Sequence, residues 1–106
     1  MRKSYIVSAK RTAIGSFLGG LATVKPKDMG SAVVKALLED ANVAPENVDE
    51  VICGNVLGAG LGQNIGRTIA LEAGIPETVC AHSVNMVCGS GLRTVMEAVM
   101  SIQCGF

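Results

Sequence analysis

Residues 48–56, VDEVICGNV, place the strongest constraint on the fold of this chain. Val51, Ile52 and Cys53 are consecutive apolar residues, a pattern typical of a strand that is covered on both faces rather than on one. Such strands occur in parallel sheets, where helices make the connections and cover both faces. The run therefore predicts a buried strand of an α/β fold.

Strand-like and helical patterns alternate along the rest of the chain. Residues 4–9 and 78–84 are predicted to form two more strands. A helix is predicted from Asp28, as its N-cap, to a C-terminus at Asn42 and Pro45. A short second helix is predicted near 64–73, with Gly74 and Pro76 just after it. A third helix follows Cys88 and ends at Gly105, with an apolar stripe of Leu92, Val95, Met96, Val99 and Met100. The order β-α-β-α-β-α predicts a layered α/β architecture with mainly parallel strands.

Charge and composition exclude several classes of function. The 106 residues carry nine basic and nine acidic side chains, and aromatic residues make up only 3%. Balanced charge and few stacking platforms argue against a nucleic-acid partner. No apolar run approaches the length of a membrane span, so no membrane partner is expected. The N-terminal residues favour a mature strand over a targeting peptide, which indicates a reduced, cytoplasmic protein.

A glycine-rich stretch, GAGLGQN at 58–64, follows the strand at 48–56. It is similar to a dinucleotide-binding turn, but Gln63 occupies the position of the last glycine in G-x-G-x-x-G. The acidic residue expected about twenty positions later is also missing. The stretch is therefore interpreted as a structural loop, at the sheet edge where active sites of parallel α/β folds gather.

Cys88 is the main candidate for a catalytic side chain. It lies between the strand at 78–84 and an amphipathic helix, so the free N–H groups and the dipole of the helix N-terminus favour a thiolate. Thiols in such positions have pKa values lowered from about 8.5 to roughly 3.5–7.5. Gly89 and Gly91 leave room for a substrate, and Ser90 is able to cap the helix or donate a hydrogen bond. The alternative interpretation is a buried cysteine at a tight turn.

The other cysteines and the single histidine receive structural interpretations. Cys53, Cys80 and Cys104 are assigned as small buried hydrophobes rather than as disulfides, because no signal peptide accompanies them. No C-x-x-C pair is present, so a metal site is not expected. His82 shares a strand face with Cys80 and is not aimed at Cys88, which favours a structural or interface role over that of a catalytic base.

Four stretches, in order, resemble the thiolase family. VNMVCGSGLRTVMEAV at 84–99 resembles the family's nucleophile motif, and YIVSAKRTAIGSFLGGLA at 5–22 resembles its N-terminus. VDEVICGNVLGAGLGQNIGR at 48–67 and ALEAGIPETV at 70–79 resemble the second strand with its loop and the approach to the third strand. The similarity at 5–22 and 57–67 is greatest to the acetyl-CoA acetyltransferase branch.

The resemblance implies a three-layer α/β/α thiolase fold and an acyl transfer between coenzyme A thioesters. Cys88 would accept the acyl group as a thioester, and its backbone N–H would also be an oxyanion donor. Acetyl-CoA or another acyl-CoA would be the substrate, with no separate cofactor and no metal. The alternatives are a degradative 3-ketoacyl-CoA thiolase and a non-catalytic piece that acts only in assembly.

The resemblance also implies that residues 1–106 are the N-terminal portion of the family's N-terminal domain. The activating histidine, the second cysteine and most coenzyme A contacts would lie outside these residues, so the 106 residues alone are predicted to be inactive. The family sheet places its fourth and fifth strands between the first and second, which would leave residues 4–9 without neighbours. A homodimer or homotetramer is implied, with the strand around 78–85 at the dimer interface.

Overall fold

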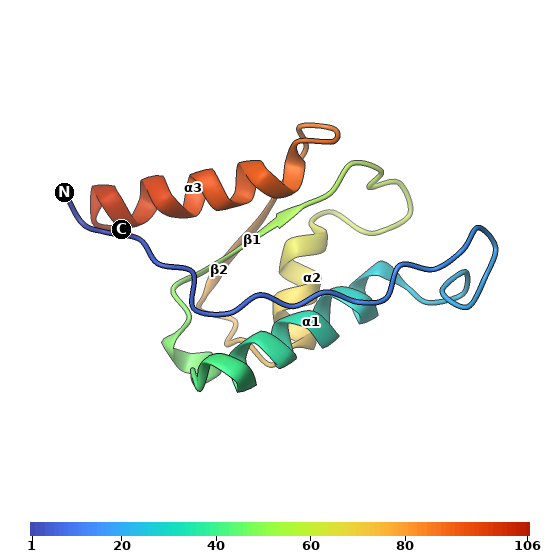
Figure 1. Cartoon of the computed structure of the whole chain (residues 1–106), viewed down its shortest axis with the longest axis horizontal. Coiled ribbons are helices and arrows are strands. Elements are labelled where there is room, and N and C mark those ends of the chain that lie inside the picture. The colour runs from blue at the N-terminus through green and yellow to red at the C-terminus, as the bar shows by residue number, and fades with distance from the viewer.

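Two parallel strands form the centre of the structure, a computed structural model that describes residues 1–106 (Figure 1). The strands are β1 (Glu50–Gly54) and β2 (Cys80–Val84), paired from Glu50 with Cys80 to Gly54 with Val84. The remaining elements are α1 (Pro26–Ala41), the 3-10 turn η1 (Pro45–Asn47), α2 (Ile65–Glu72) and α3 (Ser90–Cys104). Both strands lie inside the ranges predicted for them, and their parallel pairing is confirmed.

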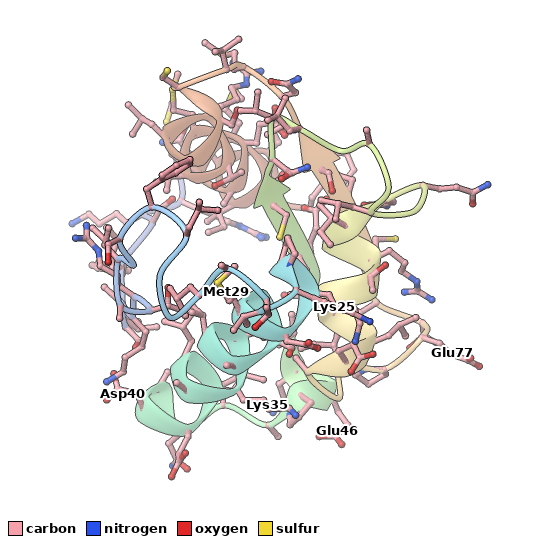
Figure 2. All side chains as sticks on the ribbon, turned by 90° about the vertical axis from the view of Figure 1, so that its right-hand side faces the viewer. Lys25, Met29, Lys35, Asp40, Glu46 and Glu77 are labelled. Atoms are coloured by element: carbon pink, nitrogen blue, oxygen red, sulfur yellow. The ribbon has the colours of Figure 1, made fainter.

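Helices cover both faces of this small sheet. Helix α3 packs on one face and α2 on the other, and α1 packs against α2 on the side away from α3 (Figure 1). The predicted α/β/α layering is therefore confirmed for the elements that form. Charged side chains of the outer elements, such as Lys35, Asp40 and Glu46, point away from the interior (Figure 2).

The hydrophobic core lies on the α2 side of the sheet. Its buried residues are Ala70, Ala73, Ile75 and Val79, with Val34, Leu38, Val48, Val51 and Ala81 packed around them. Only nine of the 106 residues are buried, so this core is small for the length of the chain. The molecule therefore has one well-packed layer, between α2 and the strands, and much exposed apolar surface elsewhere.

Helix α1 ends at the predicted residue but does not begin with the predicted N-cap. Asn42 ends α1 in the left-handed region at φ 52°, as predicted. The prediction that Asp28 is the N-cap of α1 is wrong, because Lys25 takes that position and Pro26 follows as the first helical residue. Proline is favoured there since its fixed φ suits a helix and its missing N–H is not needed. Asp28 lies in the first turn and pairs with Lys27 at 3.0 Å.

Helix α2 begins and ends as the sequence predicts. The Asn64 side chain accepts a hydrogen bond from the Arg67 amide at 3.2 Å and caps the N-terminus. At the other end Gly74 has φ 85°, and the Ile75 amide donates to the Ala70 carbonyl at 3.0 Å. That pattern is a Schellman motif, which only a residue tolerant of positive φ completes without strain.

The predicted strand at 4–9 is wrong for this structure, so the observed order of elements starts with α1. Tyr5, Ile6 and Val7 are 75%, 83% and 75% exposed, and no backbone hydrogen bond joins them to a neighbour. The segment is held beside the end of α1, where the Ser8 hydroxyl and the Lys10 ammonium both contact Asp40. A strand requires a hydrogen-bonded partner, and β1 and β2 pair only with each other.

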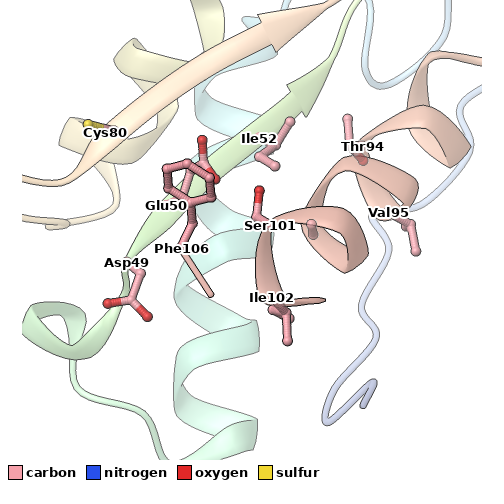
Figure 3. A pocket seen from close by; sticks show the side chains of 10 residues that line it. Asp49, Glu50, Ile52, Cys80, Thr94, Val95, Ser101, Ile102 and Phe106 are labelled. Atoms are coloured by element: carbon pink, nitrogen blue, oxygen red, sulfur yellow. The ribbon is translucent and has the colours of Figure 1, made fainter. Parts of the chain in front are cut away.

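The predicted apolar stripe of α3 forms but is mostly uncovered. Leu92, Val95, Met96 and Met100 are 44–69% exposed. A hollow of about 750 Å³ lies between α3 and the strands, lined by residues that include Ile52, Cys80, Ala98 and Phe106 (Figure 3). The sheet therefore covers the apolar stripe of α3 only in part.

Candidate active site

The turn between β2 and α3 has an unusual backbone conformation at the residue directly before Cys88. Val87, the preceding residue, has φ 50°, in the left-handed region that β-branched residues rarely adopt. Such a conformation costs on the order of 1–3 kcal/mol and persists only where the surroundings enforce it. The turn therefore stores strain directly before the candidate nucleophile.

Two side chains enforce this turn. The Val87 amide donates to Asn85 Oδ1 at 2.9 Å. Ser90 Oγ accepts from the Met86 amide at 2.9 Å and donates to the Val87 carbonyl at 2.6 Å. Ser90 is only 4% exposed, so its hydroxyl is shielded from bulk water, whereas the bond from Val87 to Asn85 is exposed. The turn is thus held on both sides of Val87.

Cys88 itself is exposed, and its amide donates to no group of the chain. The amides on either side are used, because Val87 donates to Asn85 and Gly89 donates to the Met86 carbonyl at 3.0 Å. The thiol and one free N–H therefore lie together at the N-terminal end of α3. An acyl oxygen on a thioester formed at this sulfur would find a donor beside it, as an oxyanion hole requires.

The end of β1 supports this turn through Gly54. A Cβ atom at Gly54 would lie 2.7 Å from the Ser90 carbonyl carbon and 2.8 Å from the Gly91 nitrogen. The first turn of α3 therefore rests directly on the backbone of β1, and any side chain there would push it away.

Substitution of Gly54 by alanine is expected to destabilise the fold by about 1–3 kcal/mol, because the added methyl overlaps backbone that cannot rotate aside. In the gene product that contains residues 1–106, the unfolding midpoint in urea measures the loss, and the rate of Cys88 acylation should fall with it. Gly91→Ala is the matched control, since a Cβ there meets nothing within 4 Å. Equal midpoints for the two variants would contradict the close packing described here.

His82 contacts two carboxylates and is not placed to activate Cys88. Its Nδ1 lies 3.3 Å from Glu50 Oε1 in β1, and its Nε2 lies 3.1 Å from Glu97 Oε2 in α3. Arg93 binds the other oxygen of Glu97 at 2.8 Å. The His82 contact, with Arg93 second, holds the pKa of the Glu97 carboxyl below its ordinary 4.5. This cluster ties α3 to both strands.

Substitution of Glu97 by glutamine is expected to lower the unfolding midpoint modestly at pH 7 and to have no effect in acid. Because the pKa of Glu97 is depressed in the folded state, its charge stabilises the fold above pH 4.5, and that stabilisation is lost as the pH falls further through the folded pKa. Thermal unfolding at several pH values checks this. Glu39→Gln, on exposed α1 surface, is the control. A difference from the unsubstituted protein that persists below the folded pKa would contradict it.

The other cysteines follow the predicted buried role only in part. Cys53 is half-buried, and burial raises the pKa of its thiol. The prediction is wrong for Cys80 and Cys104, which are both exposed. Cys80 starts a strand that has no neighbour on its outer side, and Cys104 lies in the last turn of α3. All four cysteines are free thiols, and His, Cys, Asp and Glu side chains form no group of three or more that could hold a metal ion.

The glycine-rich loop at 57–64 lies at the carboxyl ends of the strands, next to the Cys88 turn. Gly60 and Gly62 have φ 76° and 83°. A hollow of about 210 Å³ separates the loop from the strand ends, and Asn55, Ser83 and Asn85 are among its lining residues. Asn64 fastens the loop by donating to the Ala81 carbonyl at 3.0 Å and accepting from Ser83 at 2.9 Å. The structural interpretation of the loop stays a prediction.

The sequence did not predict a role for Asn85, and it predicted the role of Ser90 only in part. The prediction that Ser90 caps α3 or donates a hydrogen bond is confirmed for the hydrogen bond, which its hydroxyl donates to the Val87 carbonyl, and the acceptance from the Met86 amide was not predicted. Asn85 lies three residues before Cys88, at the end of the strand, and an Asx residue at such a point is itself a turn signal.

Comparison with known proteins places this geometry in context. The thiolase N-terminal domain matches residues 4–106. The chain is 54% identical over 105 residues to an acetyl-CoA acetyltransferase of Escherichia coli, covering 99% of this chain and 27% of that protein. It is 56% identical over 100 residues to a cytosolic acetyl-CoA acetyltransferase of Mus musculus, covering 94% and 25%.

A solved structure agrees with the sequence relatives. The Acat5 thiolase from Ascaris suum, in complex with coenzyme A, superposes with a TM-score of 0.93 at 38% identity, over 95% of this chain and 26% of that one. The chain thus spans about a quarter of the length of the relatives it matches. Each helix falls short of the length and apolar content that a bilayer crossing requires.

Proposed function

The chain belongs to the thiolase family through that family's N-terminal domain, and from this premise we propose that it supplies the acyl-accepting cysteine of an acetyl-CoA acetyltransferase. One observation carries the proposal. The exposed thiol of Cys88 lies beside its own free amide on a strained turn at the N-terminus of α3. A nucleophile and an oxyanion donor on one residue suit acyl transfer from a thioester.

The first step forms the acyl-enzyme. The Cys88 thiolate attacks the carbonyl carbon of acetyl-CoA, and the developing oxyanion is stabilised by the Cys88 N–H. The carbon–sulfur bond to coenzyme A then breaks, and coenzyme A leaves as a thiolate that takes up a proton. Loss of one such oxyanion donor costs about 10²–10³ in rate in enzymes where it has been removed.

The second step transfers the acetyl group to carbon. A base removes a proton from the α-carbon of a second acetyl-CoA, and the carbanion attacks the Cys88 thioester. A carbon–carbon bond forms, the Cys88 carbon–sulfur bond breaks, and acetoacetyl-CoA is released. The reverse direction is thiolysis. In this structure neither His82, which is held by two carboxylates, nor Cys104, at the far end of α3, is assigned the role of base.

Three further parts of the proposal concern partners and location. Coenzyme A acts as part of the substrate, with no separate cofactor. The protein forms a homodimer or homotetramer through β2, whose outer edge is unpaired and which lies next to the Cys88 turn. Its location is the cytoplasm, a proposal supported by the cytosolic relatives of Mus musculus and Rattus norvegicus.

The relatives from Escherichia coli, Chromobacterium violaceum and Mus musculus are acetyl-CoA acetyltransferases, which favours the acetyl-CoA branch over a degradative 3-ketoacyl-CoA thiolase. Incubation with acetyl-CoA, followed by digestion and mass spectrometry, tests the proposal. An acetyl group on the peptide that contains Cys88 is the expected product, and transfer confined to another residue would refute it.

A further inference from the structure

We propose that Ser90 is a positioning residue that holds the turn at Val87 so that the Cys88 amide stays free for the acyl oxygen. The inference rests on the proposed function, since it concerns how that site is built. It adds a role for a side chain that touches neither the thiol nor the substrate.

Among the backbone amides of residues 86–90, one has no hydrogen-bond partner. Met86 donates to Ser90 Oγ, Val87 donates to Asn85, Gly89 donates to the Met86 carbonyl, and Ser90 donates to the Val87 carbonyl at 3.1 Å. Only the Cys88 amide in this run has no partner. The partners of its neighbours therefore determine the direction in which the Cys88 N–H points.

Ser90 is the one side chain that spans the strained residue. Its hydroxyl accepts from the Met86 amide and donates to the Val87 carbonyl, so it bridges the peptide group before Met86 and the peptide group after Val87, whose φ is 50°. Loss of this buried hydroxyl would leave the Met86 amide without its partner and the Val87 carbonyl with the Ser90 amide alone. Without the hydroxyl, Val87 would relax toward negative φ and rotate the Cys88 amide.

The backbone on the other side of Ser90 is fixed as well. Gly54 brings β1 against the Ser90 carbonyl carbon, so the residue cannot shift to follow a relaxing turn. The Ser90 hydroxyl therefore stays in one position and restrains the backbone of Met86 and Val87. A misplacement of about 1 Å is enough to cost about 10²-fold in rate where groups must be aligned.

The test compares two reactions of Cys88 in the gene product that contains residues 1–106. Acetylation by acetyl-CoA, followed by rapid quench and mass spectrometry, requires both the thiol and the amide donor. Alkylation by iodoacetamide requires the exposed thiol alone. Ser90→Ala is expected to slow acetylation by about 10²-fold while alkylation stays near the unsubstituted rate. Equal losses in the two reactions, or no loss in acetylation, would overturn the inference.

Two further variants separate positioning from folding. Ser90→Thr keeps the hydroxyl and is expected to recover most of the acetylation rate. Ser31→Ala is the matched control, because Ser31 is also a buried helical serine that donates to the carbonyl three residues earlier, but in α1. Ser31→Ala should leave acetylation unchanged, and a loss equal to that of Ser90→Ala would overturn the inference.

Val87→Gly tests the mechanism directly. Glycine adopts positive φ without steric cost, so the turn then needs less restraint. Adding Ser90→Ala in this background is expected to cost much less acetylation than in the Val87 background. Where Ser90→Ala alone does not fold, the double variant is compared with Val87→Gly, and a loss well below about 10²-fold is expected. An undiminished 10²-fold loss would overturn the inference. Absence of any acetyl adduct on the unsubstituted protein would instead overturn the proposed function, and this inference with it.

Discussion

Replacement of Cys88 by alanine is expected to abolish covalent capture of acetyl groups from acetyl-CoA in the gene product that contains residues 1–106. The substitution removes the only sulfur that the structure places beside a free amide at the N-terminus of α3. Removal of a nucleophile lowers kcat by about 10⁶-fold in a well-studied serine protease, so turnover should also fall below detection. Radiolabelled acetyl-CoA, followed by gel filtration and peptide mapping, measures the capture.

The other cysteines provide matched controls for this substitution. Cys80→Ala and Cys104→Ala remove exposed thiols and should leave the acetyl adduct intact. Cys53→Ala removes a half-buried thiol whose pKa is raised by burial, and it should also leave the adduct intact. Retention of label by Cys88→Ala, or its loss in Cys80→Ala or Cys104→Ala, would contradict the assignment of the nucleophile.

Elements that depend on neighbours close in sequence could be predicted from the sequence. Asn42 and Gly74 end their helices as expected, because each supplies the positive φ that a helix C-terminus uses. The strand around Val51 was predicted from its own apolar run, and parallel pairing with β2 follows from the helix that connects them. These features need only local information.

Features that depend on distant partners could not be predicted in the same way. Residues 4–9 have the composition of a strand, but no strand of this chain lies beside them to complete the hydrogen bonds. The stripe of α3 was found by its spacing, but spacing says which residues share a face and not what covers that face. The exposure of Cys80 has the same cause, because the outer side of β2 is unpaired.

The candidate site shows the same division. Cys88 was predicted from its place between a strand and a helix, a signal that a single sequence carries. The hydrogen bonds that hold the turn before Cys88 could not be predicted. Nothing in residues 85–90, NMVCGS, indicates that Val87 takes a positive φ or that the Ser90 hydroxyl donates to the Val87 carbonyl. Valine is a poor choice for that conformation, so residue preference indicated the opposite. Only the arrangement in space reveals the strain.

Residues 1–106 produced as an isolated polypeptide are expected to form a loosely packed state without turnover of acetoacetyl-CoA. Only nine residues are buried, and the exposed apolar residues include Tyr5, Phe17 and Leu92. Monomeric soluble proteins rarely expose contiguous apolar patches larger than a few hundred Å². The structure also places no base beside Cys88, since the only histidine is held between Glu50 and Glu97.

Five measurements check this expectation. The polypeptide should bind the dye ANS, keep its far-ultraviolet circular dichroism, and have a radius about 10–20% larger than a compact form. The thiol of Cys88 should still react with iodoacetamide, because alkylation needs only exposure. The Escherichia coli relative, an acetyl-CoA acetyltransferase, serves as the positive control for the cleavage assay. Measurable acetoacetyl-CoA cleavage by the isolated polypeptide would show that residues 1–106 contain a base able to act with Cys88, and would refute the prediction. A cooperative unfolding transition without ANS binding would show that the small core beneath α2 is sufficient for a packed fold.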